Sequence, residues 1–169
     1  MTLASAAGFP VEAYAVKRPL GRVWAYTAVS LGLYSYAWFH THRRLLDGEL
    51  GQGRDDATLH TLGLLVPVLN FFIIHWLWRD LNALRARFGL PEFPDIAYLV
   101  GSIFLAPVFF SLVVNRLNEY WDVRTHGLAT ASDVNSFEKA SLVIGGCLLV
   151  LTLLTLAVAI VVVVLSATG

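Results

Sequence analysis

The sequence predicts an all-α integral membrane protein, a bundle of four transmembrane helices of which the first three are prolonged by polar or amphipathic helical ends. Of the 169 residues, 57% are hydrophobic and only 14% are charged, whereas charged residues make up about a quarter of an ordinary soluble domain. The hydrophobic residues also gather in four uncharged runs, each long enough to cross a hydrocarbon layer about 30 Å thick. We therefore expect a multi-pass protein of the cell (inner or plasma) membrane.

The first expected span covers about residues 23–39 and follows a short N-terminal segment, residues 1–18. The run is uncharged, aromatic at both ends and basic on both flanks, as is typical of a helix that crosses a bilayer. The helix is expected to begin near Pro19, because proline is tolerated in a first turn. Small side chains recur at spacings of three and four, so Ala28 and Gly32 are expected to lie on a helix-packing face.

The second and third spans are expected at about residues 59–78 and 96–114, which makes residues 19–127 a three-span region. Pro67 lies near the middle of the second run and Pro107 in the second half of the third. A proline inside a helix removes a backbone hydrogen bond and clashes with the preceding turn, so both helices are expected to be kinked.

These two spans carry a weak internal similarity. The stretch RDLNAL from Arg79 resembles NRLNEY from Asn115, and each of the first three spans continues as a polar helix that ends near a glycine. If both segments cross the membrane fully, neighbouring copies point in opposite directions and form an inverted repeat. Chance resemblance between two aromatic-rich helices is the alternative.

The last region, residues 128–169, is expected to be a loop followed by a fourth transmembrane helix at about residues 140–167. Asn135 and Glu138 have the spacing of a capping box at the start of this helix. Ser141 and Gly145 form a pair of small residues four positions apart, which is typical of a helix-packing contact inside a membrane.

The distribution of basic residues does not decide the orientation of a four-span arrangement. Six basic residues fall on each side of the membrane, while the acidic residues divide four against eight. Acidic residues contribute little to the rule that basic loops stay inside, so they favour only weakly an orientation with both termini in the cytoplasm.

A motif in the first span resembles a known bacterial membrane family. Ser30-Leu31-Gly32-Leu33-Tyr34 followed by Trp38-Phe39 is similar to the Thr-Leu-Gly-Ile-Tyr and Tyr-Trp pattern of the family called domain of unknown function 4234. Three positions depart from the pattern, with Ser30 for threonine, Ser35 for glycine and Ala37 for tyrosine. The resemblance covers about residues 17–125 and implies a membrane location and architecture, but no activity.

Polar side chains within the apolar runs are the candidate functional residues, because polar groups are costly inside a membrane. Asn70 and His75 form the candidate intramembrane polar site, with His60 and Ser111 as further candidates. Asn70 also has a structural explanation, as a partner for the carbonyl groups that Pro67 frees. No spacing of His, Cys, Asp or Glu is typical of a metal site or a catalytic dyad, so we expect no metal, no cofactor and no enzymatic activity.

The tryptophans lie close to the expected membrane surfaces, where amphipathic rings settle at the level of the lipid headgroups. We interpret all five as interfacial anchors in contact with membrane lipids: Trp24, Trp38, Trp76, Trp78 and Trp121.

The function expected from these features is that of a non-catalytic accessory, anchoring or assembly subunit of a membrane complex. Its partners would be other membrane proteins or further copies of the chain, and the lack of a basic patch excludes nucleic acid. The alternative is a small channel or transporter that uses the helices bent at Pro67 and Pro107. The third possibility is a membrane-embedded enzyme that acts on lipid.

Overall fold

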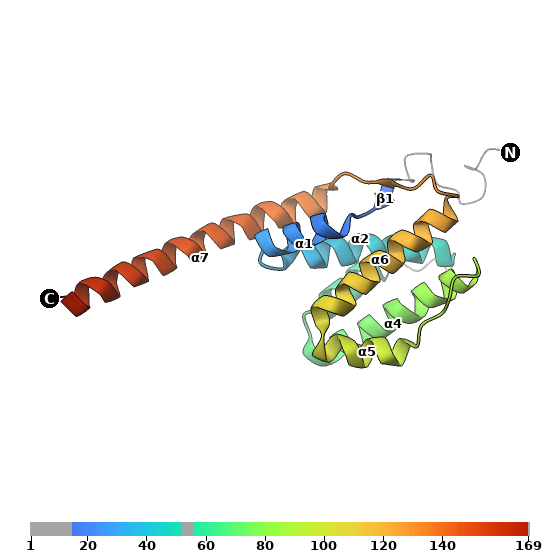
Figure 1. The fold of residues 1–169 in the computed structure, drawn as a ribbon, viewed down its shortest axis with the longest axis horizontal. Helices are drawn as coiled ribbons and strands as arrows, with labels where there is room; N and C mark the ends of the chain where they lie inside the picture. The colour runs from blue at the N-terminus through green and yellow to red at the C-terminus, as the bar shows by residue number, and fades with distance from the viewer. Residues whose placement is uncertain (1–14, 52–55, 169) are drawn as a thin grey trace.

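A computed structural model describes residues 15–51 and 56–168, and over these residues the chain is all-α, as the sequence predicts (Figure 1). The first 14 residues of the expected N-terminal segment lie outside the described residues. The described helices and strands are β1 (Ala15–Lys17), α1 (Leu20–Val29), α2 (Leu33–Leu50), α3 (Ala57–Gly63), α4 (Pro67–Ala86), α5 (Asp95–Phe104), α6 (Ala106–Arg124), β2 (Thr130–Ala131) and α7 (Ser136–Thr168).

The first predicted span is broken in its middle and forms a helical hairpin. α1 begins directly after Pro19, as expected, but it ends at Val29. Leu31 and Gly32 then adopt positive φ angles of 50° and 90°, which a right-handed helix does not contain. Glycine tolerates this conformation because it has no Cβ. The chain therefore turns back at residues 30–32, and α2 packs beside α1.

The second and third predicted spans are broken at their prolines, where we had expected kinks. Pro67 lies in the first turn of α4, after Val66 in an extended conformation, and Pro107 lies in the first turn of α6. A proline disfavours helical geometry in the residue before it but suits the first turn of a new helix. Each proline therefore lies in the first turn of a new helix, and the chain forms two further hairpins, α3–α4 and α5–α6.

The three hairpins point the same way, with their turns toward the side of the body from which α7 extends (Figure 1). We call residues 29–33, 64–69 and 103–108 the hairpin tips. α2, α4 and α6 each run from a tip to the opposite end of the body, where a glycine with positive φ follows each of them: Gly51, Gly89 and Gly127. α4 and α6 thus run in the same direction, and the inverted arrangement expected for the similar segments does not occur.

Aromatic side chains fill the core between the hairpins. Trp78 of α4 stacks on Tyr98 of α5 with ring centroids 3.8 Å apart, and Trp38 of α2 meets Phe110 of α6 edge to face at 5.0 Å. β1 pairs with β2 in a short parallel ladder, and Asn118 makes two hydrogen bonds with the backbone of Arg18. These contacts join the first described residues to α6 and to the segment before α7.

α7 is the one helix among the described residues that is long and apolar enough to cross a membrane. Its start is capped as the sequence predicts, because the Asn135 side chain accepts the Glu138 N–H and Glu138 accepts the Asn135 N–H. The first turns pack on α1 and α2. Beyond Gly146 almost every residue is exposed, so this part of α7 extends free of the body (Figure 1).

Candidate membrane-facing site

The hairpin tips expose large apolar side chains to the surroundings. Leu31 is 50% exposed, Leu65 63% and Phe104 78%. Further apolar residues of the same tips are also exposed: Val29, Val66, Val68, Leu69, Ile103, Leu105 and Val108. Exposed apolar surface gathered at one end of a molecule marks a membrane or protein contact.

Several backbone N–H groups at the tips are hydrogen-bonded within the hairpins, as entry into hydrocarbon requires. The Gly32 N–H donates to the Thr27 carbonyl at 2.7 Å, and the Leu105 N–H donates to the Gly101 carbonyl at 2.7 Å. At the second tip the Val66 N–H donates to the Gly63 carbonyl at 3.0 Å. The turns therefore present apolar side chains without leaving these amide groups unpaired.

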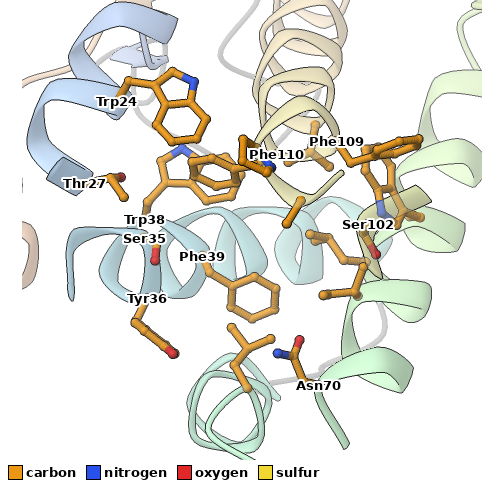
Figure 2. Close-up of a pocket in the computed structure, with 17 residues that line it drawn as sticks. Trp24, Thr27, Ser35, Tyr36, Trp38, Phe39, Asn70, Ser102, Phe109 and Phe110 are labelled. Atoms are coloured by element: carbon orange, nitrogen blue, oxygen red, sulfur yellow. The ribbon is translucent and has the colours of Figure 1, made fainter. Parts of the chain in front are cut away.

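A cavity of about 360 Å³ lies between the three hairpins (Figure 2). Its size falls at the lower end of the range for small-molecule pockets. Its lining comes from α1, α2, α4, α5 and α6 and from the turn before α4: Trp24, Thr27, Ser35, Tyr36, Trp38, Phe39, Leu64, Asn70, Ile74, Leu77, Trp78, Ser102, Ala106, Pro107, Phe109, Phe110 and Val113. We call it the tip pocket.

The tip pocket is open at the hairpin tips and closed toward the other end of the body. Ala106 and Pro107, which lie at a tip, are exposed, whereas Leu77, Trp78 and Val113, which lie farthest from the tips, are buried. Rings form much of one wall, where Trp24 and Trp38 both meet Phe110 edge to face (Figure 2). The fully exposed part of the lining therefore lies on the side of the tips.

Three polar atoms in the lining lack a hydrogen-bond partner. They are Oδ1 of Asn70, Oγ1 of Thr27 and Nε1 of Trp38, all shielded from solvent. A buried polar atom without a partner is unfavourable by about 1–3 kcal/mol, so each of the three is a place where a bound molecule could supply one. Asn70 thus lines a pocket, and it does not repair a proline kink.

The structure does not bring the other predicted polar residues to Asn70. His75 lies on α4 outside the lining and has its Nε2 3.8 Å from a carboxylate oxygen of Asp95. Ser111 accepts a hydrogen bond from the Trp24 indole at 2.9 Å, and His60 packs against Trp76 with centroids 5.5 Å apart. Each of these side chains therefore has a structural role of its own.

Three of the five tryptophans are not placed as interfacial anchors. Trp38, Trp78 and Trp121 are 2%, 3% and 5% exposed inside the helical body, where they cannot reach lipid headgroups. Their burial corrects our interpretation, and they are core residues. Trp24 and Trp76 are half-buried, so part of each ring is free to meet lipid.

The predicted packing residues have different positions. Ala28 is exposed, and Gly32 forms the left-handed turn of the first tip, so the two do not share the face of one continuous helix. Gly145 is buried where α7 crosses Ser30, and a Cβ there would collide with the Ser30 backbone. Ser141 is half-buried, with its hydroxyl donating to the Glu138 carbonyl at 2.8 Å.

Three buried arginines are structural residues that the sequence pattern did not single out. Arg18 pairs with Glu138 through two hydrogen bonds of 3.1 and 3.2 Å. Arg43 lies 2.8 Å from Asp47 and 2.7 Å from Asp80, and Arg85 donates to Glu119 and to a backbone carbonyl. The only signal in the sequence is that each arginine belongs to a polar stretch beside an apolar run.

His42 is fully buried on α2 and packs against Trp38, with ring centroids 4.7 Å apart. Burial, and then the positive charge of Arg18, lowers the pKa of His42 from 6.5 to about 3. Burial also raises the pKa of Asp47 above its usual range, against the pull of Arg43. His42 is therefore neutral at physiological pH.

Among the described residues, no three His, Cys, Asp or Glu side chains converge in a way that could hold a metal ion. The features that remain are the exposed tips, the tip pocket and the free part of α7, all at one end of the molecule.

No protein-family model, curated protein or solved structure matches the chain. The resemblance of residues 30–39 to domain of unknown function 4234 therefore stays a prediction.

Proposed function

We propose that the protein is a non-enzymatic accessory protein of a membrane, which holds a helical body against one face of the bilayer. α7 crosses the membrane, and the three hairpin tips enter the near leaflet. The observation that carries the proposal is that the exposed apolar tips and the free part of α7 lie at the same end of the molecule.

The contact between α7 and the first hairpin supports a shallow depth for the tips. The apolar run of α7 begins after Lys139, and Gly145 lies against Ser30. Five residues of helix from Ala140 to Gly145 rise about 8 Å. This depth matches the roughly 5–10 Å to which interfacial helices bury their apolar faces. The remaining helix, residues 146–168, is about 34 Å long, enough for a hydrocarbon core of about 30 Å.

The same arrangement favours one orientation. All 12 basic residues precede Ala140, and residues 140–169 contain none. Basic residues next to a span stay on the cytoplasmic side, so the body is proposed to face the cytoplasm. The ends of the chain would then lie on opposite faces of the membrane, unlike in the four-span arrangement.

The four-span bundle is the competing arrangement, and it requires each broken run to straighten into one helix. Cysteine labelling separates the two. In a Cys147→Ala background, Arg44→Cys, Glu92→Cys and Asp133→Cys each place a thiol at an exposed position. A membrane-impermeant maleimide should label all three from the same face of oriented vesicles, and it should not label Leu154→Cys in the middle of α7.

The two arrangements predict different labelling patterns. Four spans would place Glu92 on the face opposite to Arg44 and Asp133, and that pattern would overturn the single-span proposal. A channel or transporter loses its main support, because Pro67 and Pro107 lie in the first turns of new helices and do not bend continuous spans.

The accessory role itself is tested by native mass spectrometry of the protein purified in mild detergent from its own host. A stoichiometric protein partner is the expected result. The exposed side of α4 that carries Arg79 is the proposed contact. Because the Arg79 side chain is 55% exposed, Arg79→Glu should weaken the association without lowering the melting temperature. A protein that is always isolated alone would contradict the accessory role.

A further inference from the structure

We propose that the tip pocket binds one acyl chain of a bilayer phospholipid, with the lipid headgroup held at the mouth of the pocket beside Asn70. The inference rests on the proposed function, because it needs the tips to lie at the membrane surface.

The position of the opening argues for a lipid. The exposed lining residues lie at the tips and the buried ones lie farthest from them. With the tips about 8 Å below the level at which the apolar run of α7 begins, the mouth lies at the boundary between headgroups and acyl chains. A molecule that enters there comes from the bilayer.

The shape of the pocket fits one chain. Along α4 the lining runs from Asn70 at the open end to Trp78 at the closed end, a rise of about 12 Å over eight residues. The walls at the closed end are apolar and aromatic, with Phe39, Leu77 and Val113 buried around it. The bound chain therefore points out of the bilayer into the body, while the second chain of the same lipid stays in the leaflet.

Selection among lipids depends on the polar atoms at the mouth of the pocket. A chain that leaves hydrocarbon for an apolar pocket gains little hydrophobic free energy, because lipid tails are as apolar as leucine. Asn70 Oδ1 is a shielded acceptor without a partner. Once the Asn70 side chain rotates toward the mouth, a headgroup that carries a hydroxyl or ammonium group can donate to this oxygen, whereas a choline headgroup cannot. The pocket is thus expected to prefer phosphatidylglycerol to phosphatidylcholine.

The test is photocrosslinking in vesicles that contain phosphatidylglycerol with a diazirine near the end of one acyl chain, followed by mass spectrometry of the labelled peptides. We expect label on the peptides around Phe39, Leu77 and Val113. Label on residues 146–168 reports membrane insertion in the same sample. A pocket that binds no lipid is therefore distinguishable from a protein that does not insert.

Two variants at the third tip provide the specificity control. Ala106→Trp fills the mouth at an exposed lining position, whereas Val108→Trp adds the same ring at an exposed position outside the lining. Ala106→Trp should reduce the pocket label about tenfold, or about 1.4 kcal/mol of binding free energy. Val108→Trp should leave the label unchanged.

Asn70→Leu tests the headgroup contact. It should remove a preference of about fivefold for phosphatidylglycerol over phosphatidylcholine, as expected for one lost hydrogen bond. Equal labelling by the two lipids in the unsubstituted protein would overturn the headgroup contact. Label that is confined to α7, or pocket label that persists in Ala106→Trp, would overturn the bound chain while leaving the membrane anchoring intact.

Discussion

Gly145 of α7 lies against the backbone of Ser30 at the first hairpin tip, so closely that a Cβ at position 145 would collide with the Ser30 Cα and carbonyl oxygen. This contact sets the position of the tips along α7. The next residue, Gly146, has open space around it. Substitutions at Gly145 and Gly146 therefore distinguish a glycine that the packing requires from one that it does not require.

Gly145→Ala is expected to destabilise the protein by about 1–3 kcal/mol, because an added methyl group forces the two backbones apart. Gly146→Ala serves as the matched control and should be neutral or slightly stabilising, since alanine is the better helix former. Thermal unfolding in mild detergent measures both. Equal melting temperatures for the two variants would contradict the packing of α7 on the first hairpin.

Gly32→Ala tests the break in the first predicted span. Gly32 has a φ of 90°, a left-handed conformation in which a Cβ is unfavourable by about 1–2 kcal/mol, so the variant should unfold at a lower temperature. Gly21→Ala is the control, because Gly21 lies inside α1 with open space around it and should gain up to about 1 kcal/mol. If residues 20–50 formed one continuous helix, both substitutions would stabilise it.

Glu138→Ala should be one of the most destabilising single changes in the body. It leaves Arg18 buried without its carboxylate partner, a loss of about 3–5 kcal/mol for a buried pair. Asp122→Ala breaks the half-exposed pair with Lys17 and should lose less than about 1 kcal/mol. Chemical denaturation in detergent compares them.

A double variant separates the ion pair from the helix cap that Glu138 also forms. Arg18→Met with Glu138→Met removes both buried charges and should recover part of the stability that Glu138→Ala loses. A double variant no more stable than Glu138→Ala would mean that the cap, and not the pair, carries the effect.

The depressed pKa of His42 predicts that stability falls in acid. Unfolded histidine titrates near 6.5, whereas the folded protein holds His42 neutral down to about pH 3. Between these values the unfolded state binds a proton that the folded state does not. The free energy of unfolding should therefore decrease as pH falls from 6.5 toward 3, by up to about 1.4 kcal/mol per pH unit.

His42→Phe should remove this component while keeping a ring against Trp38. The measurement is the difference in melting temperature between the unsubstituted protein and the variant at pH 7.5 and pH 5. The difference should shift in favour of the variant at pH 5, and the control His126→Asn, at an exposed turn residue, should show no such shift. An unchanged difference for His42→Phe would contradict the burial of a neutral ring.

Much of the fold follows from local signals in the sequence. The start of α1 after Pro19, the capping box at Asn135 and the long apolar helix α7 are where the pattern predicts them. These features depend on a few neighbouring residues, such as a proline in a first turn or a reciprocal cap. Local chemistry of this kind is readable without knowledge of the tertiary contacts.

The hairpins were not predicted, because an apolar run has the same composition whether it crosses a membrane once or turns back halfway. The spacing of small residues predicts a packing role for Gly32, although its left-handed turn breaks the helix. Pro67 and Pro107 are compatible with a kink and with a new helix start. Only packing against the neighbouring helices decides between a kink and a new helix start. The periodicity of a single sequence carries no information about that packing.

The candidate site could be predicted only in part. Asn70 was identified from its polarity, but Thr27, Phe39 and Val113, which share its pocket, are ordinary residues whose meeting depends on the hairpins. Arg85 is 0% exposed and pairs with Glu119 of another helix, although the sequence shows only a polar stretch around it. Such long-range pairs leave no spacing signal in the chain.

The hairpin tips also have an electrostatic consequence. The carboxyl end of a helix carries about half a negative elementary charge from its aligned peptide dipoles, and the amino end carries the opposite half. At each tip the carboxyl end of α1, α3 or α5 lies next to the amino end of α2, α4 or α6, so the two half-charges nearly cancel. In the proposed membrane arrangement the tips therefore bring little net field to the bilayer, and selection among anionic and zwitterionic lipids is left to individual side chains.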